Sequence, residues 1–194
     1  MLQFPILSVI IFWPILGSFV ALAAYRSPRL VRWLSLGISL VEMALVAALF
    51  FLDLQPHATP QGTWLLLEDY AWIPWLGARY SLGLDGISLL LVLLVAFINI
   101  FSVLISWKTI DFKVGSFFFW LLFLEGTLIG LFLAADLLLF YLFWEIQIIP
   151  MFFLVGIWGH ENRIHAAVKF LFYTLSGSLF MLIALIALYV IHGH

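Results

Sequence analysis

The chain has 194 residues, of which 66% are hydrophobic and 9% are charged, and its formal net charge is −2. Soluble domains carry roughly 25% charged residues, so this composition excludes a water-soluble globular protein. The mean hydropathy of +1.22 instead predicts a chain that crosses a membrane several times. The small net charge gives no indication of a nucleic-acid partner or of substrate polarity.

Six hydrophobic segments follow one another along the chain, and each is long enough to span a bilayer. They cover residues 2–25, 33–52, 82–105, 116–134, 137–158 and 166–191. The fold class expected is therefore all-α, a polytopic transmembrane bundle of six helices in a single membrane domain over residues 1–194. The first segment resembles a signal peptide in length, but its positive charges (Arg26, Arg29 and Arg32) follow the apolar core rather than precede it. We expect a retained helix.

The basic residues between the segments indicate the orientation. Seven of the eight Lys and Arg residues flank the first, third and fifth separators, and only Arg79 lies in the second. By the positive-inside rule, the odd-numbered loops face the cytoplasm and both termini lie outside.

The second separator, residues 53–81, is long enough to hold structure of its own and is rich in Trp, Tyr and Pro. We expect a hairpin or a short helix at the outer surface of the membrane, anchored by Trp64, Trp72 and Trp75.

Three carboxyl side chains fall deep within the predicted spans: Glu42, Glu125 and Glu145. Insertion scales assign roughly 2.5–3.5 kcal/mol to such a charge at the middle of a helix, so each calls for a reason. Glu125 and Glu145 are each ten residues from Ala135, where the chain turns. In an antiparallel hairpin both would lie ~15 Å below the same surface. If both face the bundle interior, repulsion and desolvation would keep at least one protonated, as in a proton-carrying site. The alternative is that each only hydrogen-bonds a neighbouring helix.

Pro150 follows Glu145 by five residues. Because proline lacks an N–H, it leaves the carbonyl of Ile146 unpaired and favours a kink in the fifth helix, with a bound water beside the carboxylate. Gln147 adds a polar group to the same turn. A proline bend that serves packing alone is the alternative.

Other polar and small residues have plainer interpretations. Gly126 and Gly130 form a small-xxx-small pair that lets a neighbouring helix approach closely. Lys169 lies near the cytoplasmic end of the sixth helix and could connect a buried site to water. Asp85, Asp136 and Arg163 lie near helix ends, within reach of interfacial water. Glu42 has no evident partner, and the sequence does not decide between packing and function.

Several kinds of chemistry are absent from these 194 residues. Without cysteine there are no disulfides, Cys-ligated zinc or Cys-held iron–sulfur clusters. The five histidines fall in loops or at helix ends, where they do not favour a haem site, and there is no nucleotide-binding or HExxH motif.

Residues 125–159, EGTLIGLFLAADLLLFYLFWEIQIIPMFFLVGIWG, resemble two adjacent helices of the M-type, mitochondrial subunit 4-like chain of proton-translocating NADH:quinone oxidoreductase, respiratory complex I. LGLDGISLLLVLL, SWK and AAVKFLFYT are similar to further family segments in the same order. The resemblance implies a proton-translocating membrane subunit of the respiratory electron-transport chain, in an energy-transducing membrane such as the bacterial plasma membrane. The resemblance also implies that this chain itself binds no cofactor or metal, and that partner subunits hold NADH, FMN, iron–sulfur clusters and quinone.

For the site residues, the resemblance places the family's glutamate on Glu145, with Glu125 second and Lys169 third among residues for proton translocation. It also implies a difference. Family chains have about fourteen helices and relay lysines on later helices, so these six helices correspond to the N-terminal part of a larger antiporter-like unit. Two alternatives stay open: a subunit of a multisubunit Na⁺/H⁺ antiporter or membrane-bound hydrogenase, and a truncated structural or assembly subunit without transport. Which quinone is used, and whether the ion is H⁺ or Na⁺, does not follow from the sequence.

Overall fold

A computed structural model describes residues 5–52, 57–59 and 62–192. Its helices are α1 (Ile6–Ala23), α2 (Pro28–Leu49), α3 (Gly86–Thr109), α4 (Val114–Leu133), α5 (Leu137–Trp158) and α6 (Arg163–His192). All six predicted helices are present, and each is long and apolar enough to span a membrane. Residues 2–4 of the predicted first helix, and 53–56 and 60–61 of the predicted outer segment, lie outside the described residues.

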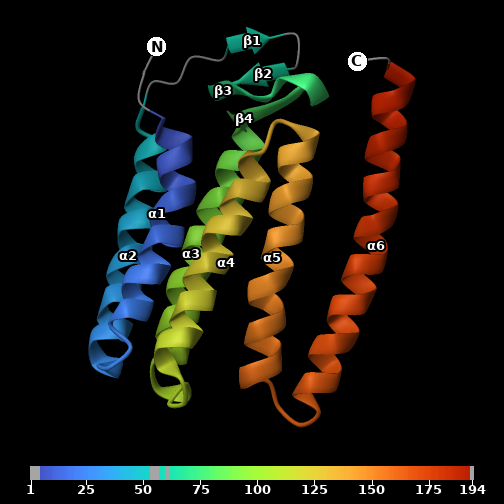
Figure 1. Ribbon diagram of the computed structural model, residues 1–194. Helices are drawn as coiled ribbons and strands as arrows, with labels where there is room; N and C mark the ends of the chain where they lie inside the picture. Colours follow the sequence, from blue (N-terminus) through green and yellow to red (C-terminus); the bar gives the residue numbers. More distant parts are fainter. Residues whose placement is uncertain (1–4, 53–56, 60–61, 193–194) are drawn as a thin grey trace.

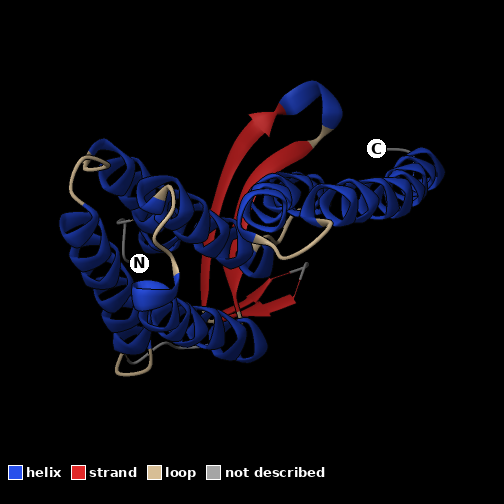
Figure 2. Ribbon diagram, turned by 90° about the horizontal axis from the view of Figure 1, so that it is seen from below, coloured by secondary structure: helices blue, strands red, loops and turns tan. Residues whose placement is uncertain are grey.

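The helices form a bundle with one outlying member (Figure 1). Helices α1 to α4 pack together around a core to which Leu7, Val46 and Ile129 belong, while α5 lies against α4. Helix α6 packs mainly against α5 and leaves most of its apolar side chains exposed. Figure 2 shows α6 at the end of the row of helices, away from α1 and α2.

Four strands cap the end of the bundle at which α1 begins and α6 ends (Figure 1). They form two antiparallel pairs: β1 (His57–Thr59) with β2 (Gly62–Trp64), and β3 (Leu66–Ile73) with β4 (Ala78–Leu84). A short 3-10 helix, η1 (Pro74–Leu76), and Gly77 at φ +68° make the turn between β3 and β4. A hairpin in this segment agrees with the expectation. Its position on the outer side, like that of both termini, stays a prediction.

The expected start of the third helix at residue 82 is wrong. Residues 82–84 belong to β4 and pair with β3, and α3 begins only at Gly86. Asp85 caps this helix: its Oδ1 accepts a hydrogen bond from the Ser88 N–H at 2.6 Å, and Ser88 Oγ accepts one from the Asp85 N–H at 2.8 Å. The second helix also begins earlier than expected, at Pro28, because proline is favoured in the first turn.

Glu68 of β3 ties the hairpin to the start of α1. Its carboxylate accepts hydrogen bonds from the Leu7 N–H at 2.6 Å, the Ser8 N–H at 3.2 Å and the Ser8 hydroxyl at 2.6 Å. Because the only hydroxyl hydrogen of Ser8 goes to Glu68, the Tyr80 hydroxyl donates to Ser8 Oγ at 3.0 Å. A carboxylate at a helix N-terminus satisfies otherwise unpaired N–H groups and interacts favourably with the helix dipole.

The hairpin also covers the turn between α4 and α5. The Ala135 N–H donates to the Ser81 carbonyl at 2.9 Å, and Asp136 caps α5 by accepting from the Leu138 and Leu139 N–H groups at 2.9 and 3.0 Å. Strand β4 thus holds in place the turn at Ala135, which is ten residues from both Glu125 and Glu145. At the other end of the bundle, Arg32 of α2 forms an ion pair with Asp111 at 3.1 Å.

Candidate functional site

Glu145 lies in the middle of α5, on the side that faces α6. Its carboxyl neighbours the Tyr141 hydroxyl one turn earlier, which in turn neighbours the Ser178 hydroxyl of α6. The side chain is half-buried, and its Oε1 atom is buried without a hydrogen-bond partner. A carboxyl oxygen in this state favours a bound water or proton, because an unpaired buried polar atom costs about 1–3 kcal/mol.

Gln147 and Pro150 are both buried in α5. The helix runs from Leu137 to Trp158 through Pro150, so the kink at this proline stays a prediction. Trp144 and Phe140 stack on each other with ring centroids 6.1 Å apart. Both rings pack against the apolar core.

Lys169 lies in the second turn of α6, where its side chain is exposed. In the described part of the chain it forms no ion pair with Glu145 or with any other acid. The structure therefore does not bring these two sequence-predicted residues together.

Glu125 lies on α4, in the most buried part of the bundle, with 2% of its side chain exposed. Its Oε2 accepts a hydrogen bond from Asn99 Nδ2 of α3 at 2.6 Å, and its Oε1 has no partner. The carboxyl that interacts with it is Glu42 of α2, not Glu145. The sequence left open whether Glu125 and Glu145 both face the bundle interior, because the shared depth of two residues does not fix the rotation of their helices.

Glu42 is the functional candidate that sequence reasoning left without a partner. It is fully buried, at 0% exposure, and neither of its carboxyl oxygens has a hydrogen-bond partner. A signal was present in the sequence, since Ser35, Ser39 and Glu42 are spaced four and three residues apart and lie on one buried face of α2. Such a polar stripe inside an apolar helix points to polar partners on the helices opposite.

The two glycines after Glu125 contact different helices. A Cβ atom on Gly126 would lie 2.5 Å from the Ile15 side chain and 2.8 Å from the Ile11 carbonyl oxygen of α1. On Gly130 the added atom would lie against the Phe143 ring of α5. Close approach at Gly126 brings α1 against α4 and closes the interior around Glu125 to lipid.

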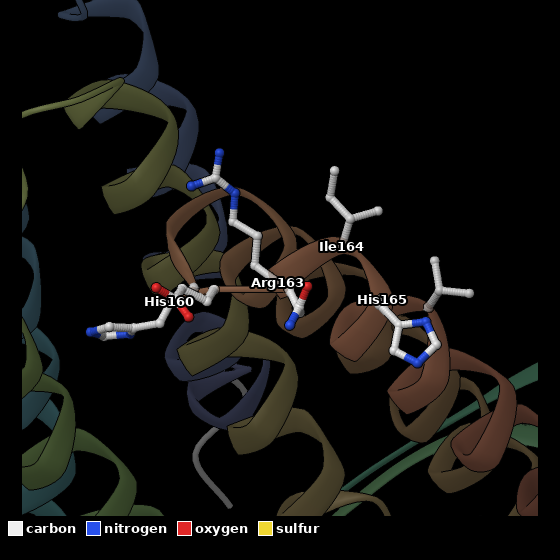
Figure 3. A pocket seen from close by; sticks show the side chains of 8 residues that line it. His160, Arg163, Ile164 and His165 are labelled. Atoms are coloured by element: carbon white, nitrogen blue, oxygen red, sulfur yellow. The ribbon is translucent and has the colours of Figure 1, made fainter.

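His160 lies in the loop between α5 and α6, and His165 lies in the first turn of α6. With Arg163 and Ile164 they line an open depression, and Figure 3 shows the two imidazoles pointing in different directions. No group of three or more His, Cys, Asp or Glu residues that could hold a metal occurs within the described ranges.

The chain was compared with protein-family models and with known proteins, and both comparisons gave matches. Residues 134–194, which contain α5, α6 and Glu145, match the family model described as NADH:quinone oxidoreductase/Mrp antiporter, transmembrane. The chain is 39% identical over 186 residues to NAD(P)H-quinone oxidoreductase chain 4-3 of a Nostoc species, which is 95% of this chain and 32% of that protein. The chain is thus similar to NAD(P)H-quinone oxidoreductase chain 4 proteins over nearly its whole length.

Solved structures agree with this relationship. A chain of respiratory complex I from Thermus thermophilus superposes with a TM-score of 0.82 at 27% identity, covering 96% of this chain and 36% of that one. The archaeal membrane-bound sulfane sulfur reductase shares the fold, with a TM-score of 0.79 at 21% identity over 96% of this chain and 28% of that one. The chain spans about a third of the length of the relatives it matches. Glu145, Pro150 and Lys169 fall in the segment matched by the family model, whereas Glu125 and Glu42 lie outside it.

Proposed function

We propose that this chain contributes a proton-translocating element to an antiporter-like membrane subunit of NADH:quinone oxidoreductase, in an energy-transducing membrane such as the bacterial plasma membrane. Partner subunits would hold NADH, FMN, the iron–sulfur clusters and quinone, and this chain would move protons. The observation that carries the proposal is Glu145: a half-buried carboxyl, with one unpaired oxygen, in the middle of a spanning helix. The identity to chain 4 proteins supports the same function.

Glu145 has the properties that a proton carrier needs. Its carboxyl can exist as a neutral acid or as a carboxylate, so it can take a proton from one neighbouring group and give it to another. Tyr141 and Ser178 offer hydroxyl groups that can pass a proton along the interface between α5 and α6. Glu125 is the second proton-carrying group. Lys169 would act at the end of α6, as a link to water rather than as a partner of the buried carboxyl.

The test is NADH-driven proton uptake into membrane vesicles that carry Glu145→Gln. Glutamine keeps the size of the side chain but cannot bind or release a proton near neutral pH. We therefore expect the number of protons moved per electron to fall. Glu161→Gln is the matched control, because Glu161 is an exposed carboxylate in the loop before α6. An unchanged proton-to-electron ratio in Glu145→Gln membranes, with the complex assembled normally on a native gel, would contradict the role of Glu145.

A sodium/proton antiporter subunit is the second candidate, because the matched family model also describes Mrp antiporters. This candidate predicts that expression of the assembly restores sodium-resistant growth at alkaline pH to an antiporter-deficient host. Growth that does not depend on sodium would count against it.

A further inference from the structure

The interior of the α1–α4 group contains a polar cluster that is separate from Glu145. It consists of Ser39 and Glu42 on α2, Asn99 on α3 and Glu125 on α4, all of which are buried. The three helices meet there because each turns its polar residues to the face that packs on the others. Val46 of α2, Val92 of α3 and Ile129 of α4 extend the same faces as apolar core.

Asn99 joins α2 to α4. The two hydrogens of its amide go to Ser39 Oγ at 2.9 Å and to Glu125 Oε2 at 2.6 Å. The Ser39 hydroxyl hydrogen goes to the Ser35 carbonyl at 3.0 Å. Ser39 Oγ is therefore an acceptor toward Asn99, and this direction fixes the orientation of the amide.

Three carboxyl oxygens in this cluster have no protein partner: both oxygens of Glu42 and Oε1 of Glu125. Glu42 lies one turn beyond Ser39 on the same face and interacts electrostatically with Glu125. Unpaired oxygens on two facing carboxyls leave places for protons, and for a water that bridges them.

No cation balances the two carboxyls within the described helices. Helix α1 has no titratable side chain, and the only one on α3 is Lys108 in its last turn. The other charged residues of α2 are Arg29 and Arg32 in its first turns, and Arg32 pairs with Asp111. Two carboxylates without a counter-charge in an apolar interior would repel each other and lose their hydration, so protons must carry the balancing charge.

We propose that Glu42 and Glu125 form a coupled proton-binding site that is separate from the site at Glu145. The Asn99 bridge between Ser39 of α2 and Glu125 of α4 holds the two helices together beside it. When one carboxyl loses a proton to water, the negative charge that appears changes the proton affinity of the other carboxyl. The site then exchanges its two protons in two linked steps. Its use in transport rests on the function proposed above, whereas its existence does not.

The experiment is an infrared pH titration of the protonated-carboxyl band. The full chain is reconstituted in phospholipid vesicles as wild type, Glu42→Gln, Glu125→Gln and the double variant. Each spectrum is recorded in H₂O and in D₂O, so that exchanging carboxyls are identified by their isotope shift. Titration without sodium and with added NaCl distinguishes a proton site from a sodium site. Circular dichroism and gel filtration check that each variant folds.

We expect the wild type to lose the band of this pair in two steps. Each single variant should lose it in one step whose midpoint lies below the upper wild-type midpoint by about 1 pH unit or more, because glutamine stands in for the neutral partner and removes the repulsion that raises the second step. The double variant should lack the band. Asn99→Leu keeps both carboxyls and removes the bridge, so its two midpoints should shift, which tests the site even where Glu125→Gln fails to fold. Glu161→Gln should leave the titration unchanged.

Three results would overturn the proposal. A single variant whose step coincides with the upper wild-type step would mean that the carboxyls titrate independently. A band that neither titrates nor exchanges with D₂O would mean two inert acids. Midpoints that depend on sodium would mean that the site binds a metal cation. None of these results depends on NADH-driven transport, so failure of this proposal and failure of the role of Glu145 remain distinguishable.

Discussion

At the scale of single residues, Gly126 marks a close contact between α1 and α4 that involves a backbone atom. A Cβ atom there would come within 2.5 Å of Ile15 and 2.8 Å of the Ile11 backbone oxygen, and a backbone atom cannot move aside as the end of a side chain can. We expect Gly126→Ala to destabilise the protein by about 1–3 kcal/mol, because α1 must move away from α4. The free energy of unfolding in detergent, followed by circular dichroism, measures this.

Gly37 of α2 is the matched control for this substitution. It is also a helical glycine, but a Cβ atom there would meet nothing within 4 Å. Gly37→Ala should therefore be neutral or stabilise the protein by about 0.5–1 kcal/mol, since alanine loses less backbone entropy on folding. Equal effects of the two substitutions would show that helix propensity, and not the contact with α1, determines the result at Gly126.

At the scale of elements, the start of α3 shows what the sequence could and could not predict. Residues 82–94 are almost continuously apolar, so hydropathy alone merges β4 with the helix. The side chains that separate them are Asp85 and Ser88, whose spacing forms a capping box in the structure. Asp followed by Ser three residues later is a signal for a helix start and would have placed the boundary at Gly86.

The cap at Asp85 also has a pH dependence. The hydrogen bond from the Ser88 N–H is the main cause that lowers the pKa of Asp85 below its usual value. A carboxyl whose pKa is lower in the folded state stabilises the protein above its unfolded pKa, and this stabilisation is lost as the pH falls through the lowered folded value. Asp85→Ala should cost about 0.5–2 kcal/mol at neutral pH.

Thermal unfolding of Asp85→Ala and of wild type across the acid range measures both effects. The difference between the two proteins should be constant at neutral pH and should shrink as the medium becomes more acidic. The exposed carboxylate Glu161 provides the control, because Glu161→Ala should unfold as wild type does at each pH. A difference for Asp85→Ala that grows at low pH would contradict the cap.

For the candidate sites, too, the sequence predicted one property and missed another. Chain length and the position of a turn gave the depth of Glu125 and Glu145 in the membrane, but not the direction in which either side chain points. One extra residue rotates a helix face by about 100°, so a small error in a helix boundary turns a carboxyl from one neighbour to another. The spacing of Ser35, Ser39 and Glu42, together with Asn99 as an amide within an apolar helix, contained the missing information about rotation.

At the scale of the whole molecule, the buried polar groups form two centres on different helices. One joins α2, α3 and α4 through the hydrogen bonds of Asn99, and the other places Glu145 and Tyr141 of α5 beside Ser178 of α6. In the described residues no hydrogen bond links a member of one centre to a member of the other. The apolar residues Ile129, Leu131 and Phe143 fill the contact between α4 and α5.

Because the two centres are separate, substitutions in them should change the free energy of unfolding additively. Asn99→Leu removes the bridge in the first centre and Tyr141→Phe removes the hydroxyl in the second, so the two changes in unfolding free energy should add within about 0.5 kcal/mol. The matched pair is Asn99→Leu with Glu125→Gln, because the side chains of Asn99 and Glu125 are hydrogen-bonded at 2.6 Å. For this pair the changes in unfolding free energy should deviate from additivity by about 0.5–3 kcal/mol. Unfolding of the single and double variants under one detergent condition gives both coupling energies. A coupling energy between Asn99 and Tyr141 as large as that between Asn99 and Glu125 would contradict this separation. It would mean that the two centres form one connected network, in which a proton bound at Glu42 or Glu125 changes the proton affinity of Glu145.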